Sequence, residues 1–332
     1  MAESTLSLVR NDLRKAVGNM LGAGLDLTAW EPDFSTRVDM CIDIGCRSLY
    51  EPPILAGEAQ AHVWSFMQPK LTSFDLNATY STGTVTIVAG AVTGSGTTFP
   101  TWAADGELVI SGVPYTVASR GSTTSLTLDD TGVTAAAGST YTLQHVDYQL
   151  PDLFGGFRGE LYLGGSSGTI GQTLQRCDIH EILDLRNQAV ADFSAQPCKY
   201  AVFAADQTGT GGQRWQMSVW PTPDAEYTVS GIYSINPYQL TSTYIYPMGG
   251  LPLAECLRES CLAAAEVEFT GSPGVHSSLV LPRLAAAISR DRQMNNPGIL
   301  GQNLDYSDRR RSWRQNGPRV QHLGLGAMSY TG

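Results

Sequence analysis

Apolar residues near the start of the chain recur every three or four positions, the spacing that places side chains on one face of an α-helix. The first such series is Leu6, Val9, Leu13, Val17 and Met20 or Leu21. The second is Val38, Ile42, Gly45 or Cys46 and Leu49. Gly22 is a suitable stop for the first helix, and Pro52 and Pro53 prevent the second from continuing. The pattern predicts two amphipathic helices that pack together.

Between residues 79 and 147 the pattern changes to short alternating runs rich in Ser and Thr, which are typical of strands. These runs are 84–88, 107–110, 115–117 and 125–128, and Gly, Pro and Asp residues separate them. Helical or aromatic-rich sequence lies on both sides of this segment. We therefore expect a small all-β domain at 79–147 that is inserted into another domain.

The segment after it mixes loops, one helix and two further strands. The Gly-rich stretch 155–171 is interpreted as loops and short strands, and 179–190 as an amphipathic helix. Alternating residues in 215–220 and 227–233 flank the turn-forming sequence 221–224, which contains two prolines and an aspartate. This pattern predicts a β-hairpin.

Two helices are predicted to close the fold. The first runs from Leu253 to Glu268 and ends near Gly271, and Ser272 and Pro273 supply an N-cap and a first residue for the second. In the second helix the residues expected to face inward are Leu281, Leu284, Ala285 and Ile288, and Pro282 is expected to kink it. An extended arm is expected from about residue 299.

The predicted fold class is thus α+β, with a helical body that carries a β-hairpin, a small inserted all-β domain and an extended C-terminal arm. The expected boundaries are 1–78 and 148–298 for the body, 79–147 for the insert and 299–332 for the arm.

Composition indicates a folded globular chain without membrane partners. Of 332 residues 42% are hydrophobic and 16% are charged, and no apolar run reaches the roughly 18 to 20 residues that cross a bilayer. The N-terminal residues lack the apolar core of a signal peptide, so synthesis in a cytoplasm is expected. The formal net charge of −10 argues against a chain that grips nucleic acid over its whole surface.

Catalytic, metal and cofactor motifs are not found. The six cysteines form no C-x-x-C pair and are expected to be buried free thiols. Asp178, His180, Glu181 and Asp184 look like metal ligands, but acids in the first turns of a helix are the simpler interpretation. Without a phosphate-binding loop or a nucleophile with its base, we expect no enzymatic activity, no cofactor and no metal.

The C-terminal residues combine cations with aromatic rings. The candidate site residues are Tyr306, Arg309, Arg310, Arg311, Trp313, Arg314 and Arg319. Such a set suits an arm that docks on a partner protein, a solvated tail, or contacts to nucleic acid. The acidity of the remaining chain favours the docking arm over nucleic acid.

Several phrases together resemble the head-to-tail connector (adaptor) proteins of tailed bacteriophages, over roughly residues 5–78 and 148–305. In order these phrases are 19–22 (NMLG), 49–53 (LYEPP), 61–67 (AHVWSFM), 214–215 (RW), 220–224 (WPTPD), 233–237, 262–266 (LAAAE), 288–292 and 300–305 (LGQNLD). The segment 83–143 is similar to a small β-module that recurs in phage virion proteins. The inserted module departs from the plainest pattern of the adaptor family.

The resemblance implies a structural virion protein in the neck between head and tail, made in the host cytoplasm. It implies a closed ring of about twelve copies around the DNA channel, seated under the portal protein and above a tail, nozzle or stopper protein. The C-terminal arm would dock on the portal, and packaged DNA would pass an acidic lumen without specific binding. Two alternatives stay open: a virion binding module whose β insert recognises a host glycan or another virion protein, and a stopper or tail-terminator ring.

Overall fold

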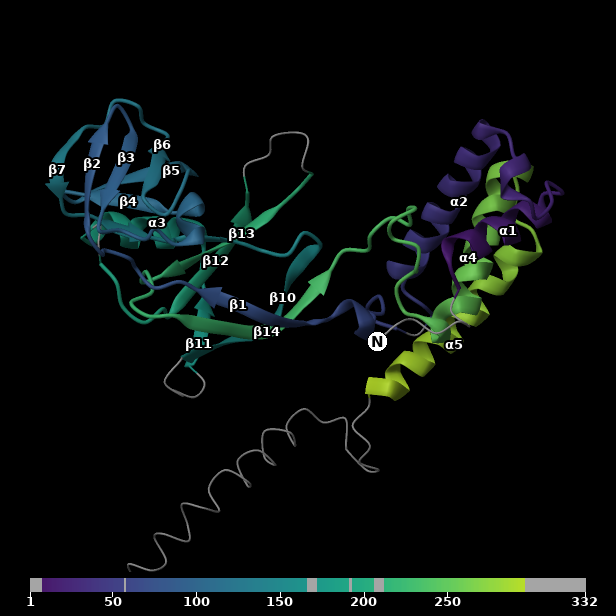
Figure 1. The fold of residues 1–332 in the computed structure, drawn as a ribbon. Coiled ribbons are helices and arrows are strands. Elements are labelled where there is room, and N and C mark those ends of the chain that lie inside the picture. The colour runs from purple at the N-terminus through teal and green to yellow at the C-terminus, as the bar shows by residue number, and fades with distance from the viewer. Residues whose placement is uncertain (1–7, 57, 166–171, 191–192, 206–211, 296–332) are drawn as a thin grey trace, which may run out of the picture. The chain divides into compact units, whose positions relative to one another are not determined.

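The computed structural model describes residues 8–56, 58–165, 172–190, 193–205 and 212–295 (Figure 1). Residues Met1–Ile288 form one compact unit, and Ser289–Gly332 are assigned to a second. The described part of the chain contains fourteen strands in two seven-stranded sheets, together with five α-helices. Among the described residues no helix has the length and apolar character needed to cross a bilayer.

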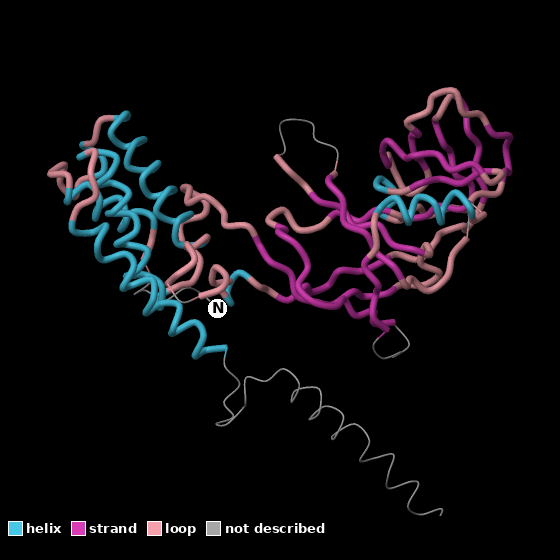
Figure 2. Tube along the Cα trace, turned by 180° about the vertical axis from the view of Figure 1, so that it is seen from behind, coloured by secondary structure: helices cyan, strands magenta, loops and turns pink. Residues whose placement is uncertain are grey.

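The fold is mostly β, so the predicted α+β class, a helical body with a hairpin and a small inserted β domain, is wrong. Figure 2 shows that strands make up most of the regular structure between residues 70 and 235. The main cause of the error is the glycine-rich stretch after residue 153, which forms the twelve-residue strand β10 (Phe154–Gly165) rather than loops and short strands. Its backbone pairs with β11 (Gln172–Arg176) and β14 (Tyr227–Ile235) on its two sides, and backbone hydrogen bonds do not require an alternating side-chain pattern.

Four α-helices share one hydrophobic core: α1 (Arg10–Met20), α2 (Pro32–Tyr50), α4 (Ala254–Thr270) and α5 (Val275–Asn295). Short 3-10 turns at Leu27–Ala29, Ser65–Met67 and Leu251–Leu253 adjoin them. The two predicted N-terminal helices are confirmed, and Leu13, Val17, Val38, Ile42 and Leu49 are buried as their spacing requires. Pro32 occupies the start of α2, where its missing N–H costs nothing.

Helix α2 depends on a tryptophan outside the helix for one of its last carbonyls. The residue that would donate to the Leu49 carbonyl within the helix is Pro53, which has no N–H. The buried Trp64 indole Nε1 donates to that carbonyl instead, at 2.9 Å. The ring of Trp64 also stacks on Phe66 at 5.4 Å, so the chain after the helix is fixed against its end.

The two C-terminal helices are also confirmed, with differences at the start and on the buried face of the second. Helix α5 begins at Val275, so Ser272 and Pro273, predicted as its N-cap and first residue, lie before it. Gly271 ends α4 in the left-handed conformation, at φ 71°. In α5, which continues through Pro282, Leu284 and Ile288 are buried, whereas Leu281 is 56% exposed and Ala285 is also exposed. The buried stripe of α5 is narrower than predicted. The predicted arm at 299–332 lies outside the described residues.

The first sheet has the strand order β1-β14-β10-β11-β12-β13-β9. Besides β10, β11 and β14, its strands are β1 (Lys70–Leu76), β9 (Asp147–Gln149), β12 (Lys199–Ala204) and β13 (Trp215–Trp220). The only parallel pair among these described strands is β11 with β12, and helix α3 (Ile179–Gln188) makes the connection between them. The predicted helix at 179–190 is therefore confirmed.

The predicted hairpin is wrong in its pairing, although both of its strands exist. Strand β13 pairs with β12 and β9, and β14 pairs with β1 and β10. Alternation identifies a strand but not its neighbour, and the connection 221–226 is much longer than a two-residue hairpin turn.

The second sheet lies within residues 84–144 and has the order β7-β2-β3-β6-β5-β4-β8. Its strands are β2 (Thr84–Val88), β3 (Ala91–Ser95), β4 (Glu107–Ile110), β5 (Val113–Arg120), β6 (Ser125–Leu128), β7 (Ala135–Ser139) and β8 (Thr142–Gln144). A 3-10 turn at Thr101–Asp105 precedes β4. Phe99, Leu108 and Leu143 are fully buried in a separate core, which supports this sheet from within.

Candidate functional site

The docking residues predicted from the sequence lie outside the described residues. They are Tyr306, Arg309, Arg310, Arg311, Trp313, Arg314 and Arg319. Within the described part of the chain, the best candidate for an interaction site is a groove on the helices.

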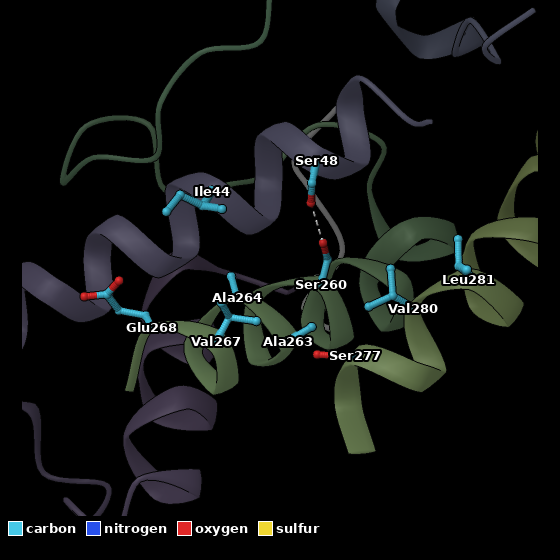
Figure 3. A pocket seen from close by; sticks show the side chains of 10 residues that line it. All are labelled: Ile44, Ser48, Ser260, Ala263, Ala264, Val267, Glu268, Ser277, Val280 and Leu281. Carbon is cyan, nitrogen blue, oxygen red and sulfur yellow. Dashed lines mark hydrogen bonds between the residues drawn. The ribbon is translucent and has the colours of Figure 1, made fainter. Parts of the chain in front are cut away.

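The groove has a volume of about 380 Å³ and is lined by α2, α4 and α5 (Figure 3). Its apolar lining consists of Ile44, Ala263, Ala264, Val267, Val280 and Leu281. Ser48, Ser260, Ser277 and Glu268 supply its polar groups. We call this surface the helical groove.

Large apolar side chains of the helical groove remain open to water. Ile44 and Val267 are each 52% exposed, and Leu281 is 56% exposed. Single exposed apolar residues are ordinary on a protein surface, but a group of them around a hollow is typical of an interaction site. The sequence offered a signal for Ile44, because it is a large apolar residue outside the buried stripe of its helix.

The floor of the groove is the close contact between α2 and α4. A Cβ atom added to Gly45 would lie 2.6 Å from the Cα of Cys261, so only glycine permits this approach. The Ser260 hydroxyl donates to the Gly45 carbonyl at 2.9 Å, and the Ser48 and Ser260 hydroxyls lie 2.8 Å apart (Figure 3). These serines bond to each other and to the backbone, so the floor is rigid and electrically neutral.

Acidic residues of α4 hold the start of α5 in place. The carboxylate of Glu266 accepts hydrogen bonds from the backbone N–H groups of Gly274, His276 and Ser277, at 3.0 to 3.1 Å. Burial acts to raise the pKa of Glu266, but these hydrogen bonds to its charged form lower the pKa overall. The carboxylate thus satisfies the free N–H groups of the first turn of α5.

A second link between α4 and α5 involves the buried carboxylate of Glu259. One of its oxygens lies 2.6 Å from Nδ1 of His276, and the other lies 3.5 Å from the guanidinium of Arg283. Arg283 also pairs with Glu255 at 2.9 Å. These contacts, together with those of Glu266, fix the position of α5 along one side of the groove.

A buried polar cluster joins the second sheet to the strands that follow it. His145 stacks on Trp102 with ring centroids 5.5 Å apart, and its Nδ1 lies 2.8 Å from Nδ2 of Asn77. Burial lowers the pKa of His145, which favours the neutral ring. Trp102 and Tyr115 are half-buried and pack against the core of the second sheet. Both rings thus contribute to the packing of the second sheet.

The acidic group at 178–184 has helix-capping and ion-pairing partners. The carboxylate of Asp178 accepts a hydrogen bond from the backbone N–H of His180 at 2.8 Å and caps α3. Glu181 pairs with Lys199 at 2.5 Å. Within the residues described, three or more His, Cys, Asp or Glu side chains nowhere form a group suited to a metal ion.

The six cysteines are free thiols, four of them buried. Cys41, Cys46, Cys256 and Cys261 pack in the helical core, and Cys177 and Cys198 are half-buried. Burial raises the pKa values of Cys41 and Cys256 to about 11, so these thiols are unreactive near neutral pH.

Comparison of the sequence with protein-family models and with curated proteins finds no match. The helical groove is a candidate interaction surface on the strength of its geometry alone.

Proposed function

We propose that this chain is a structural subunit of a tailed-bacteriophage neck, which forms the head-to-tail adaptor ring under the portal protein. In this role it has no catalytic task. It binds copies of itself, the portal above and a tail, nozzle or stopper protein below.

The observation that carries the proposal is the convergence of the adaptor-like phrases on one core. Phrases 49–53, 61–67, 262–266 and 288–292 are far apart in sequence, yet residues of each belong to the same hydrophobic cluster. Trp64 of the second phrase donates to Leu49 of the first, and Tyr50 meets Phe66 edge to face at 6.4 Å. Segments that resemble one family and also build one packed core are a coherent structural unit.

The helical groove supports the self-association that the proposal requires. A subunit of a ring must present apolar surface that becomes buried only when the ring forms. Ile44, Val267 and Leu281 offer such surface, each more than half exposed.

The charge of the chain suits a DNA channel. With a formal net charge of −10, the chain as a whole repels phosphate. A channel wall that does not attract DNA lets the genome pass without counterion release and tight binding.

The proposal is tested with portal rings assembled from the portal protein encoded in the same genome. The full chain is mixed with these rings and compared by negative-stain microscopy with a chain that ends at Gly301. We expect the full chain to cap the portal and the shortened chain to leave it bare, since the arm carries Trp313 and the arginines. A variant with Arg176→Ala, an exposed cation of β11 far from the arm in sequence, is the matched control and should still cap.

Failure of the full chain to bind any portal ring would contradict the adaptor role. Binding to a preformed portal–adaptor assembly, but not to the portal alone, would indicate a stopper ring. Capping by a chain that lacks residues 80–144 would show that the second sheet is not needed for docking.

A further inference from the structure

A loop between β14 and α4 exposes three consecutive large side chains. Tyr244 is 56% exposed, and Ile245 and Tyr246 are each 40% exposed. We call residues 241–246 the projecting loop. It is fixed by hydrogen bonds: Tyr238 Oη donates to the Tyr246 carbonyl at 2.6 Å, and the N–H of Arg10 in α1 donates to the Ile245 carbonyl at 2.8 Å.

The projecting loop and the helical groove lie on different sides of α2. Asp39 of α2 pairs with Arg10 and Arg14 of α1, the helix to which the loop is bonded. Ile44 of the groove comes five residues later, which is about 140° around the helix axis at about 100° per residue. One copy therefore cannot close its own groove with its own loop.

The two surfaces match in chemistry. The stretch from Asn236 to Ala254 contains no charged residue. The only charged side chain that lines the described groove is Glu268, and Arg37 pairs with it at 3.2 Å. Docking the loop in the groove would thus bury no unpaired charge, whereas docking the arginine-rich C-terminal segment there would bury several positive charges.

We propose that the helical groove of one copy receives the projecting loop of the next copy. This inference deepens the proposed adaptor function and rests on it for the closed ring. Because groove and loop are unlike surfaces on one chain, the contact is head-to-tail, and such a contact closes into a ring when its rotation permits. Tyr244 and Ile245 enter the apolar hollow between Ile44, Val267 and Leu281, and the serine oxygens that line it accept a hydrogen bond from the Tyr244 hydroxyl.

The test uses two variants of the full chain that damage one surface each. Ile44→Asp places a charge in the groove, and Ile245→Asp places one on the loop. Both residues are substantially exposed, so both variants should fold, as circular dichroism will check. Sedimentation velocity and native mass spectrometry should show that the unmodified chain self-associates with rising concentration, while each variant binds itself at least about tenfold more weakly.

Mixing the two variants provides the decisive measurement. The intact loop of Ile44→Asp fits the intact groove of Ile245→Asp, so the mixture should form a one-to-one dimer that grows no further. Leu25→Asp, which changes a 60% exposed residue that belongs to neither surface, is the matched control and should associate like the unmodified chain. Leu281→Asp is the second groove variant if Ile44→Asp does not fold.

Three results would overturn the inference. The first is normal association of both variants. The second is normal association of Ile245→Asp together with loss in Ile44→Asp, which would give the groove another occupant, such as a second groove or the C-terminal arm. The third is an unmodified chain that stays monomeric both at high concentration and when mixed with portal rings.

These results are separable from the adaptor function itself. If all variants still cap portal rings as complete rings, the adaptor role stands and the loop-to-groove contact is wrong. If the contact is found but no portal is bound, the contact stands and the adaptor role is wrong.

Discussion

Replacing Gly45 with alanine tests the close approach of α2 and α4. The new Cβ atom would lie 2.6 Å from the Cα and 2.7 Å from the backbone nitrogen of Cys261. Side-chain rotation cannot relieve either contact, because both atoms belong to the backbone of α4. The two helices must therefore move apart by about 1 Å to restore ordinary van der Waals spacing.

The expected cost follows from two opposing effects. Overpacking of a tight core costs about 1–3 kcal/mol, and a backbone contact belongs at the upper end of that range. Alanine is better than glycine inside a helix by about 1 kcal/mol, which offsets part of the loss. The net destabilisation should be about 2 kcal/mol, and the hydrogen bond from Ser260 of α4 to the Gly45 carbonyl of α2 will lengthen as well.

Thermal unfolding followed by circular dichroism at 222 nm reports on the helices. A loss of about 2 kcal/mol should lower the Tm by about 4–8 °C. Gly18→Ala in α1 is the comparison, since its Cβ would overlap the ring of Trp30, a side chain and not a backbone, so that rotation of this half-buried ring can relieve the overlap at the cost of the hydrogen bond from Trp30 Nε1 to the Ala23 carbonyl. A Gly45→Ala chain as stable as the unmodified one, or more stable, would refute the close approach of α2 and α4.

Three further predictions concern a helix cap, a buried hydrogen bond and the thiols. Glu266→Gln should lower the free energy of unfolding in urea by about 1 kcal/mol at pH 7. Because the folded-state pKa of this carboxyl is lowered, its contribution to stability is lost as the pH falls through that pKa. A stability difference between the two chains that persists after the carboxyl is protonated would contradict the cap. Trp64→Phe should cost about 1–2 kcal/mol in the same assay, because the Leu49 carbonyl loses its donor, and unchanged stability would argue against that bond. Native-state alkylation at pH 8, read by mass spectrometry, should leave unmodified the four buried thiols, Cys41, Cys46, Cys256 and Cys261. Rapid labelling of any of them would show that the helical core opens.

Much of the helical structure could be predicted from the sequence because its signals are local. The stripe that includes Val38, Ile42 and Leu49, with Pro52 after it, is contained in one stretch of chain. The same holds for α4, whose end at Gly271 follows from the tolerance of glycine for the left-handed conformation. These elements need no knowledge of their partners.

The sheets could not be predicted in the same way, because strand pairing is decided between distant segments. Strand β10 contains five glycines and no regular alternation, and it exists because β14 and β11 pair with its backbone from both sides. Strands β13 and β14 were recognisable individually, but their neighbours come from elsewhere in the chain. Misassigning these pairings turned a mostly β fold into a predicted helical body.

The candidate interaction residues also differ in how far the sequence could predict them. The arginines and Trp313 of the arm are recognisable in the sequence by their residue types, but the sequence does not say where they lie. The helical groove, in contrast, is a property of three packed helices: Ile44, Val267 and Leu281 are ordinary apolar residues until packing leaves them uncovered together. Sequence by itself determined which stretches form these helices, since periodicity and capping act over a few residues. Only the tertiary structure decided which apolar side chains stay exposed, because burial depends on what the rest of the chain brings against them.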